Sequence, residues 1–384
     1  MDSILTFPRS VFRENHKMLR TTVRRFLERE CKPRQAQWDK DGKVDRDTWL
    51  KAGREGLICA TTGPEWGGSG GYFGHAAVIV EEIGRSGVSG LGFGLHSDVV
   101  APCIERLVTP EQKAQWLPQC AKGEVTLAIA MSEPGAGSDL KAIRTTARRD
   151  GGDEYVINGN KTFISNGLNG DLVVEVAKTE PELGAKGVSL ILVEADHTGF
   201  RKGRKLDKMG LEAADTAKLF FEDVRVPVSI ILGEENKGFV YLMQELVQER
   251  FVIALGAAAK MEAMFDETVR FTKERVVFGR PLFDFQNTRF KLAEIKVRTT
   301  AVRMMVDQYL AEHLRRKLTV QEGAMAKLFA TKELGKALDE LLQLYGGYGH
   351  MMENPITRAF VDSRVTHIYG GTSEVMEELI SRSL

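Results

Sequence analysis

The sequence has few features of a secreted, membrane-spanning or nucleic-acid-binding protein. Only 4 of its 384 residues are cysteine, and no two form a Cys-x-x-Cys pair, which favours free thiols in a reducing compartment. Lysine plus arginine equals aspartate plus glutamate, 53 against 53, so no global basic excess is available for nucleic acid or an anionic membrane. No apolar run approaches the roughly 18 residues that span a bilayer. Since no signal or transit peptide is visible at the start, we expect a cytoplasmic protein.

Hydrophobic periodicity divides the chain into three regions. Residues 11–31 carry apolar side chains at helical spacing, and similar patterns at about 46–57, 72–86 and 97–107 make the first third helical. Beyond about residue 121 the pattern changes to short, often β-branched runs bounded by glycine and polar residues. These runs lie at 125–130, 155–164, 172–176, 188–193 and 218–221.

One β run predicts a hairpin turn, and the last third of the chain predicts a helical bundle. The run 155–164 contains Asn158-Gly159, the dipeptide most typical of a tight hairpin, so we expect a hairpin turn there. After Gly233, helical patterns return and form four long segments, which are typical of a bundle. They lie at 237–274, 287–317, 320–345 and 372–383. This order disfavours a nicotinamide dehydrogenase, in which strands and helices alternate from the start.

We therefore predict an α+β protein of several domains. Residues 1–120 are expected to form an N-terminal helical domain, 121–232 a middle antiparallel β-barrel or sandwich, and 233–384 a C-terminal four-helix bundle. The histidines form no HExxH or similar spacing, so no metal site is expected. The absence of a GxSxG elbow disfavours a serine hydrolase.

A glycine-rich turn ends the first β run. It reads Ala130-Met131-Ser132-Glu133-Pro134-Gly135-Ala136-Gly137-Ser138-Asp139. Such a turn exposes backbone N–H groups and can approach a flat polar ligand closely. It lacks the Lys-Ser/Thr of a phosphate-binding P-loop and is not a GxGxxG dinucleotide turn, so glycine content alone leaves an ordinary turn as the alternative.

A single carboxylate lies on an apolar helix face. Leu242, Leu246, Ile253 and Gly256 share this face with Glu249, because the five positions are separated by steps of three and four. An acid in this position is paired, exposed at the edge of the stripe, or a buried base with a raised pKa. The pattern alone leaves all three open.

Two glycine-rich segments lie near the C-terminus. Residues 343–350 read Gln-Leu-Tyr-Gly-Gly-Tyr-Gly-His, and 368–374 read Ile-Tyr-Gly-Gly-Thr-Ser-Glu. The second opens a terminal helix, with Thr372 or Ser373 as N-cap. A helix N-terminus after two glycines can bind an anion or an oxyanion, although a plain helix start explains the pattern as well.

Together these segments resemble the acyl-CoA dehydrogenase family of flavoenzymes, over nearly the whole chain. Residues 130–139 match the family's first signature and 343–362 nearly match its second, although His350 stands where an aromatic or aliphatic residue is usual. Residues 233–239, 245–250 and 369–374 are similar to the long-chain branch. The resemblance implies FAD as cofactor, an acyl-CoA substrate oxidised to trans-2-enoyl-CoA, electron-transferring flavoprotein as acceptor and a homotetramer.

One departure concerns the catalytic base. Most family members carry the catalytic glutamate directly after the tyrosine of the last motif, where this chain has Gly370. The long-chain and isovaleryl branches instead carry it at the position of Glu249. The resemblance therefore implies that Glu249 takes the Cα proton while N5 of FAD takes the hydride from Cβ. The N–H of Gly370 and a flavin ribityl hydroxyl are then expected to bind the thioester oxygen.

The resemblance also transfers the binding residues one by one. Residues expected at the flavin ring are Ala130, Met131, Ser132, Gly137, Ser138, Phe163, Ile164 and Ser165, with Thr372, Ser373 and Glu374 completing the site. Those expected at the adenosine diphosphate half of a neighbouring subunit's FAD are Arg275, Phe278, Gln286, Gln343, Gly346 and Gly347. Substrate contacts are expected from Ser138, Val247, Gln248, Arg250, Gly370 and Gly371, with a pocket floor at 93–104 that includes Gly94, Leu95, Val99 and Val100.

Two other functions share this scaffold. An acyl-CoA oxidase would keep the motifs and pass electrons to oxygen, but such oxidases usually carry an additional C-terminal domain. A non-catalytic acyl-CoA-binding subunit is disfavoured by the retained Glu249 and the complete flavin motifs.

Overall fold

The computed structural model describes residues 9–384, and its first region is helical. A buried apolar cluster that includes Trp38, Trp49 and Phe93 holds the first helices together. The four cysteines of the chain are buried and free. The elements are α1 (Glu14–Phe26), the π-helical turn η1 (Leu27–Cys31), α2 (Gln35–Asp41), α3 (Arg46–Arg54), α4 (Phe73–Ser86), the π-helical segment η4 (Leu95–Val100), α5 (Ala101–Leu107) and α6 (Pro110–Lys122).

The middle region is a mixed β-sheet. Its strands are β1 (Leu127–Ala130), β2 (Thr146–Asp150), β3 (Glu154–Ile164), β4 (Leu172–Lys178), β5 (Val188–Glu194), β6 (Phe200–Lys205) and β7 (Ala217–Pro227). Neighbours along the sheet run β1-β4-β2-β3-β7-β6, with β5 on the other edge of β4. Most pairs are antiparallel, as expected, but β4 pairs in parallel with β1 and β2. The chain returns to β4 in the direction of β1 after the β2–β3 hairpin, which makes these two pairings parallel.

The expected hairpin at Asn158-Gly159 is wrong. These residues lie inside β3, where the register against β7 shifts between Ile157 and Gly159. A Cβ atom on Gly159 would lie 2.3 Å from the Thr145 hydroxyl, so glycine allows this close approach at a bulge. The turn of the β2–β3 hairpin contains Gly151 and Gly152 instead, both with positive φ.

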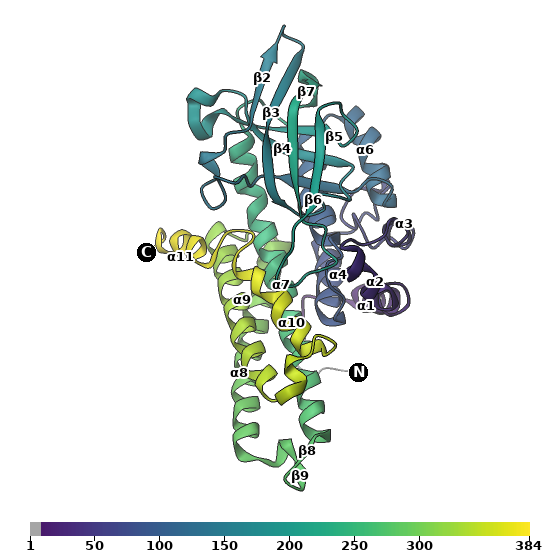
Figure 1. Cartoon of the computed structure of the whole chain (residues 1–384), viewed down its shortest axis with the longest axis vertical. Coiled ribbons are helices and arrows are strands. Elements are labelled where there is room, and N and C mark those ends of the chain that lie inside the picture. Colours follow the sequence, from purple (N-terminus) through teal and green to yellow (C-terminus); the bar gives the residue numbers. More distant parts are fainter. Residues whose placement is uncertain (1–8) are drawn as a thin grey trace.

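The C-terminal region is a helical bundle that extends away from the sheet (Figure 1). Its long helices are α7 (Gly238–Glu274), α8 (Gln286–Leu314) and α9 (Val320–Gln343). The short α10 (Pro355–Ser363), which the sequence analysis did not predict, packs on α9 and α7, and α11 (Ser373–Ser381) packs on α9. The short strands β8 (Val276–Val277) and β9 (Arg280–Pro281) form the end of the bundle farthest from the sheet (Figure 1).

A buried ion network fixes helix α4 against the bundle. Arg303 on α8 is 1% exposed, and its guanidinium lies 2.5 Å from the Glu262 carboxylate on α7 and 2.8 Å from the Glu81 carboxylate on α4. Arg9 also bonds Glu81, at 2.6 Å. Because these charges are paired, they can remain buried, and they hold α4 and α7 in contact. Within residues 9–384, no helix is long and apolar enough to cross a membrane.

Candidate active site

Glu249 lies on α7 beside the turn that precedes α11. Burial raises the pKa of its carboxyl group, while the positive charges of Arg250 and Lys327 act in the opposite direction. A Cβ atom built on Gly370 would lie 3.5 Å from Oε1 of Glu249 and 2.6 Å from Cδ1 of Ile253. The structure therefore brings Glu249 and Gly370 together, and a side chain at position 370 would compete for the space beside this carboxylate.

Two cations hold the Gly370 turn in place. Nε of Arg250 donates to the carbonyl oxygen of Gly370 at 3.3 Å, and Nζ of Lys327 donates to that of Gly371. Both glycines have positive φ, +63° and +93°, a conformation that glycine adopts without steric cost. Burial lowers the pKa of Lys327 to about 8. The turn is therefore fixed by its own carbonyl groups, next to the carboxylate of Glu249.

The glycine-rich turn after β1 is supported from beneath by a buried lysine. Glu133 and Ala136 close the turn with two backbone hydrogen bonds of 2.8 and 3.1 Å. Nζ of Lys161, on β3, donates to the carbonyl oxygens of Met131 at 3.3 Å and Val176 at 2.6 Å. It also lies 3.0 Å from the Glu133 carboxylate. A buried cation thus ties the turn to the sheet.

Lys161 meets a second carboxylate, Glu175, at 3.3 Å. Burial alone would raise the pKa of Glu133, but Lys161 and the N–H groups of Arg144 and Thr145 bring it below its ordinary value. For Glu175, burial dominates and raises the pKa to about 8 in spite of Lys161. The charge therefore resides on Glu133, and Glu175 carries a proton near neutral pH.

Phe163 presents an aromatic ring at the surface of the sheet. The residue is 70% exposed and its φ is +62°, a strained conformation for an aromatic residue. The neighbouring N–H of Thr162 donates to the carbonyl oxygen of Ser132 at 2.9 Å, so Phe163 lies next to the glycine-rich turn. Ser165 is half-buried, whereas the Ile164 side chain is 3% exposed and packs in the sheet core, leaving its backbone for any ligand.

These features fit a bound flavin. A Cβ atom on Gly135 or Gly137 would meet nothing within 4 Å, so the turn borders open space at both positions. At the start of α11, Thr372 caps the helix by accepting from the N–H of Val375 at 3.3 Å. The hydroxyl of Ser373 is buried without a hydrogen-bond partner in the described chain. An exposed ring, an open turn and an unpaired hydroxyl suit a planar polar cofactor.

The residues expected at the adenosine diphosphate half of FAD do not lie at the glycine-rich turn. Arg275, Phe278 and Gln286 are exposed at or beside β8 and β9, at the far end of the bundle (Figure 1). Phe278 is 96% exposed, with φ of +48°. The guanidinium of Arg275 lies over the ring of Tyr348, 5.5 Å from its centroid. Gln343, Gly346 and Gly347 form an exposed neighbouring patch.

The expected substrate residues divide into two sets. Arg250 and Gly371 belong to the turn beside Glu249, and Ser138 is exposed on the glycine-rich turn. Val247 instead packs against Gly323 on α9. The side chain of Gln248 is engaged within the protein: its amide donates to the Asp98 carbonyl oxygen at 2.6 Å, and its oxygen lies 3.0 Å from Nε2 of His313.

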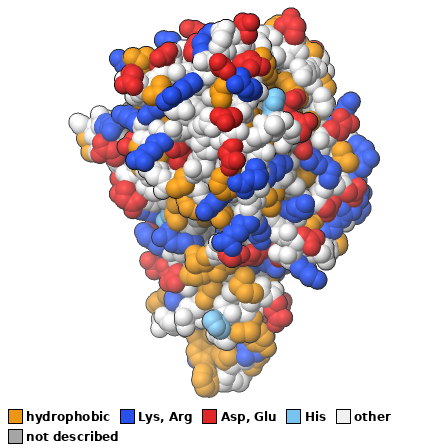
Figure 2. Space-filling view, turned by 45° about the horizontal axis from the view of Figure 1, so that its top comes forward, with side chains coloured by type: hydrophobic (Ala, Val, Ile, Leu, Met, Phe, Trp, Pro, Cys, Tyr) orange, Lys and Arg blue, Asp and Glu red, His pale blue; other side chains and the backbone are white. Residues whose placement is uncertain are grey.

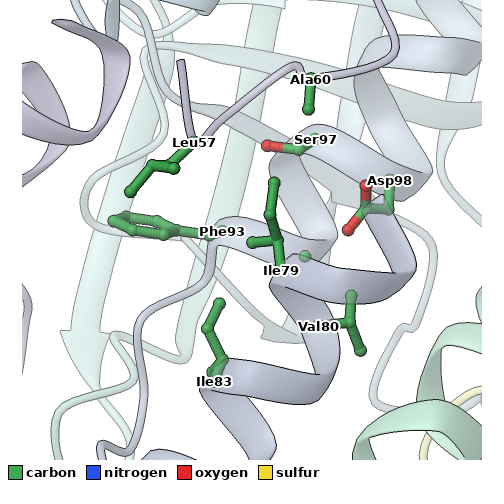
Figure 3. A pocket seen from close by; sticks show the side chains of 9 residues that line it. Leu57, Ala60, Ile79, Val80, Ile83, Phe93, Ser97 and Asp98 are labelled. Carbon is green, nitrogen blue, oxygen red and sulfur yellow. The ribbon is translucent and has the colours of Figure 1, made fainter. Parts of the chain in front are cut away.

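A small pocket lies between α4 and η4 (Figure 3). It is lined mainly by apolar side chains, together with Ser97 and Asp98, and its free volume of about 10 Å³ has room for about one water molecule or hydroxyl group. Of the residues expected at the pocket floor, Gly94 lines this pocket, whereas Leu95, Val99 and Val100 pack in or against the core shared with the β-sheet. Sequence reasoning missed Ser97 and Asp98, because it looked only for apolar residues in this segment.

Comparisons with known proteins agree with this geometry. Sequence models of the acyl-CoA dehydrogenase N-terminal, middle and C-terminal domains match residues 13–124, 128–224 and 236–384. The long-chain specific acyl-CoA dehydrogenase of Sus scrofa is 47% identical over 98% of this chain and 88% of the relative. The isovaleryl-CoA dehydrogenase of Pongo abelii is 35% identical over 96% and 88%.

Solved structures give the same result. The crystal structure of acyl-CoA dehydrogenase from Geobacillus kaustophilus superposes with a TM-score of 0.96 at 45% identity, covering 98% of this chain and 99% of that one. The butyryl-CoA dehydrogenase of Megasphaera elsdenii superposes with a TM-score of 0.91 at 30% identity, covering 99% of both chains. The chain therefore belongs to the acyl-CoA dehydrogenase family of FAD-dependent oxidoreductases, as its motifs and its three-part fold predict.

Proposed function

We propose that this protein oxidises a long-chain or branched acyl-CoA to its trans-2-enoyl-CoA, with Glu249 as the base that removes the Cα proton. The observation that carries the proposal is the position of the Glu249 carboxylate, 3.5 Å from the place where a side chain at Gly370 would begin. The identity of 47% to a long-chain specific relative supports the substrate class. The domain limits 1–120, 121–232 and 233–384 belong to the same proposal.

The residues around Glu249 suit proton abstraction. Burial raises the pKa of the carboxyl group, so its ionised form is a stronger base than an exposed glutamate. Arg250 and Lys327 oppose this shift and favour ionisation at neutral pH. Bound FAD supplies the acceptor for the hydride that leaves Cβ. The N–H of Gly370, on the turn fixed by Arg250 and Lys327, is the donor we assign to the thioester oxygen.

The decisive experiment is an anaerobic titration of the FAD-loaded protein with palmitoyl-CoA, monitored by the visible flavin absorbance. The wild-type protein should bleach promptly, and Glu249→Gln should keep its FAD but lose the reaction by at least about 10²-fold, because no other group takes the proton. Glu245→Gln is the matched control. This residue lies one turn earlier on α7 and pairs with Arg106 at 2.5 Å, so its substitution should leave bleaching nearly intact. Near-normal bleaching of Glu249→Gln would remove Glu249 from the role of base.

The electron acceptor is part of the same proposal. We assign electron-transferring flavoprotein rather than oxygen, because the chain is similar to dehydrogenases over nearly its whole length. The reduced protein should therefore reoxidise slowly in air and quickly when electron-transferring flavoprotein is added. Fast reoxidation by air would favour an oxidase instead.

We also propose a homotetramer in which subunits share their FAD sites. Hydrophobic side chains gather over the narrow end of the molecule (Figure 2), and exposed ones on the bundle include Phe278, Phe290, Val297, Met304 and Met352. A patch of this kind is typical of an interface. Light scattering should give four copies, and Phe278→Ser should weaken FAD retention as well as assembly. A monomer with full FAD content would contradict this arrangement.

A further inference from the structure

The pocket between α4 and η4 contains a carboxyl group without a partner. Asp98 is 6% exposed, and no hydrogen bond or ion pair reaches its carboxyl group from residues 9–384. Figure 3 shows this group among Ile79, Val80 and Ser97, on a wall that is otherwise apolar. Burial raises the pKa of Asp98 to about 7, so a large fraction of the group is protonated near neutral pH. It can then both donate and accept a hydrogen bond.

The pocket wall lies against the helix that carries Glu249. A Cβ atom on Gly94, one of the lining residues, would lie 3.9 Å from Val252 and 3.8 Å from the Asp98 carboxyl oxygen. The amide of Gln248, the residue before Glu249, donates to the Asp98 backbone. Val80, on the opposite wall, lies 3.8 Å from the Cβ position of Gly256. Since Gly256 is two turns along α7 from Glu249, the pocket lies about 10 Å from the base along this helix, a separation that an extended acyl chain can span.

A plain alkyl chain can pack against the apolar side chains of this wall but cannot hydrogen-bond to Ser97 or Asp98. An apolar occupant would displace any water and leave the Asp98 carboxyl without a hydrogen bond in an apolar environment, which is unfavourable. Ser97 adds a second polar group to the wall, and its Oγ accepts from the N–H of Cys59 at 3.0 Å, so its own O–H is directed elsewhere. A cationic substituent would lose its hydration among Ile79, Val80 and Phe93, and is therefore a poorer match than a neutral one.

We propose that this pocket selects acyl-CoA thioesters whose chain carries a hydroxyl group, and that Asp98 binds this hydroxyl. The proposal rests on the function proposed above and specifies its substrate class. A site that hydrogen-bonds a substrate group discriminates strongly against the analogue that lacks it, because its own polar group is then left unpaired. Asp98 is thus a specificity residue and takes no part in the proton transfer.

The test compares plain and terminally hydroxylated acyl-CoA of equal length, from octanoyl to hexadecanoyl, on the FAD-loaded protein. The ratio of kcat/KM for the hydroxylated over the plain thioester should exceed about tenfold at the length that places the hydroxyl at Asp98. Asp98→Leu should reduce this ratio to one or below, and Asp98→Asn should keep it within about threefold of wild type, since an amide still donates and accepts. Glu245→Gln, which changes a carboxyl group outside the pocket lining, is the matched control and should leave the ratio unchanged.

A second measurement separates binding from chemistry. Calorimetric titration of Glu249→Gln with the same thioesters should show the hydroxyl preference in Kd, and the Glu249→Gln/Asp98→Leu double variant should lose it. A ratio of one or below at every chain length in the wild-type protein, or an unchanged ratio in Asp98→Leu, overturns the proposal while dehydrogenation itself stands. If neither thioester bleaches the wild-type flavin, the proposed function fails first, whereas the binding comparison still decides the role of Asp98.

Discussion

A single methyl group at position 370 tests how the site is packed. In Gly370→Ala, the new Cβ would lie 2.6 Å from Cδ1 of Ile253, closer than two carbon atoms can approach. The positive φ of +63° adds about 1–2 kcal/mol for a residue with a side chain, and overpacking adds about 1–3 kcal/mol. We therefore expect Gly370→Ala to destabilise the protein by about 2–5 kcal/mol. Because the conflict involves one atom, Ile253→Val, which deletes Cδ1, should relieve the overpacking.

The assay is the melting temperature of the FAD-loaded single and double variants. Ile253→Val alone should cost about 0.5–1.5 kcal/mol. The double variant should be about 1–3 kcal/mol more stable than the sum of the two single changes predicts, or at least about 2 °C in melting temperature. Flavin reduction should not recover with stability, because the methyl group at 3.5 Å from Glu249 Oε1 still occupies substrate space. Strictly additive changes would refute this account of the packing, and a recovered rate would refute the placement of the substrate.

Three further outcomes are expected. Arg303→Leu should destabilise the protein by about 3 kcal/mol in thermal unfolding, because it breaks two buried ion pairs, although Glu81 keeps Arg9 and Glu262 keeps Arg85 as partners. Arg298→Leu on the same helix removes half-buried ion pairs and should cost about 1 kcal/mol or less. Glu175→Gln should gain melting temperature relative to wild type as the pH rises from 5 to 8. The pKa of Glu175 is raised to about 8 in the folded protein, so over this range the unfolded chain ionises the group while the folded protein keeps it protonated, and the wild type loses stability. Phe163→Ala should raise the Kd for FAD at least about tenfold in fluorescence titrations, while the fold, judged by circular dichroism, remains intact.

The long elements were predictable because periodicity accumulates along a helix. The expected helix at 237–274 differs from α7 by one residue at its start, since the apolar stripe repeats for ten turns. Short elements contain too few repeats of an apolar pattern to be predicted in this way. Helix α10 was not predicted because it is short, although Pro355 at its first helical position favours a helix start. Asn158-Gly159 misled for a related reason: a glycine in a strand marks a bulge as readily as a turn, and only the pairing with β7 distinguishes the two.

The residues of the candidate site were also only partly predictable from the sequence. Glu249 could be singled out because one acid on an apolar face is conspicuous, and the structure brings it to Gly370. The pocket wall could not, because η4 is buried on both faces. Val99 and Val100 enter the core shared with the β-sheet, while Ser97 and Asp98 face the small pocket that we propose to receive the substrate chain. A permanent core excludes an unpaired carboxyl group, whereas a ligand cavity is hydrated between turnovers and tolerates one. On a helix enclosed on all sides, the polar face therefore points to the ligand, and a search for apolar residues alone selects the wrong face.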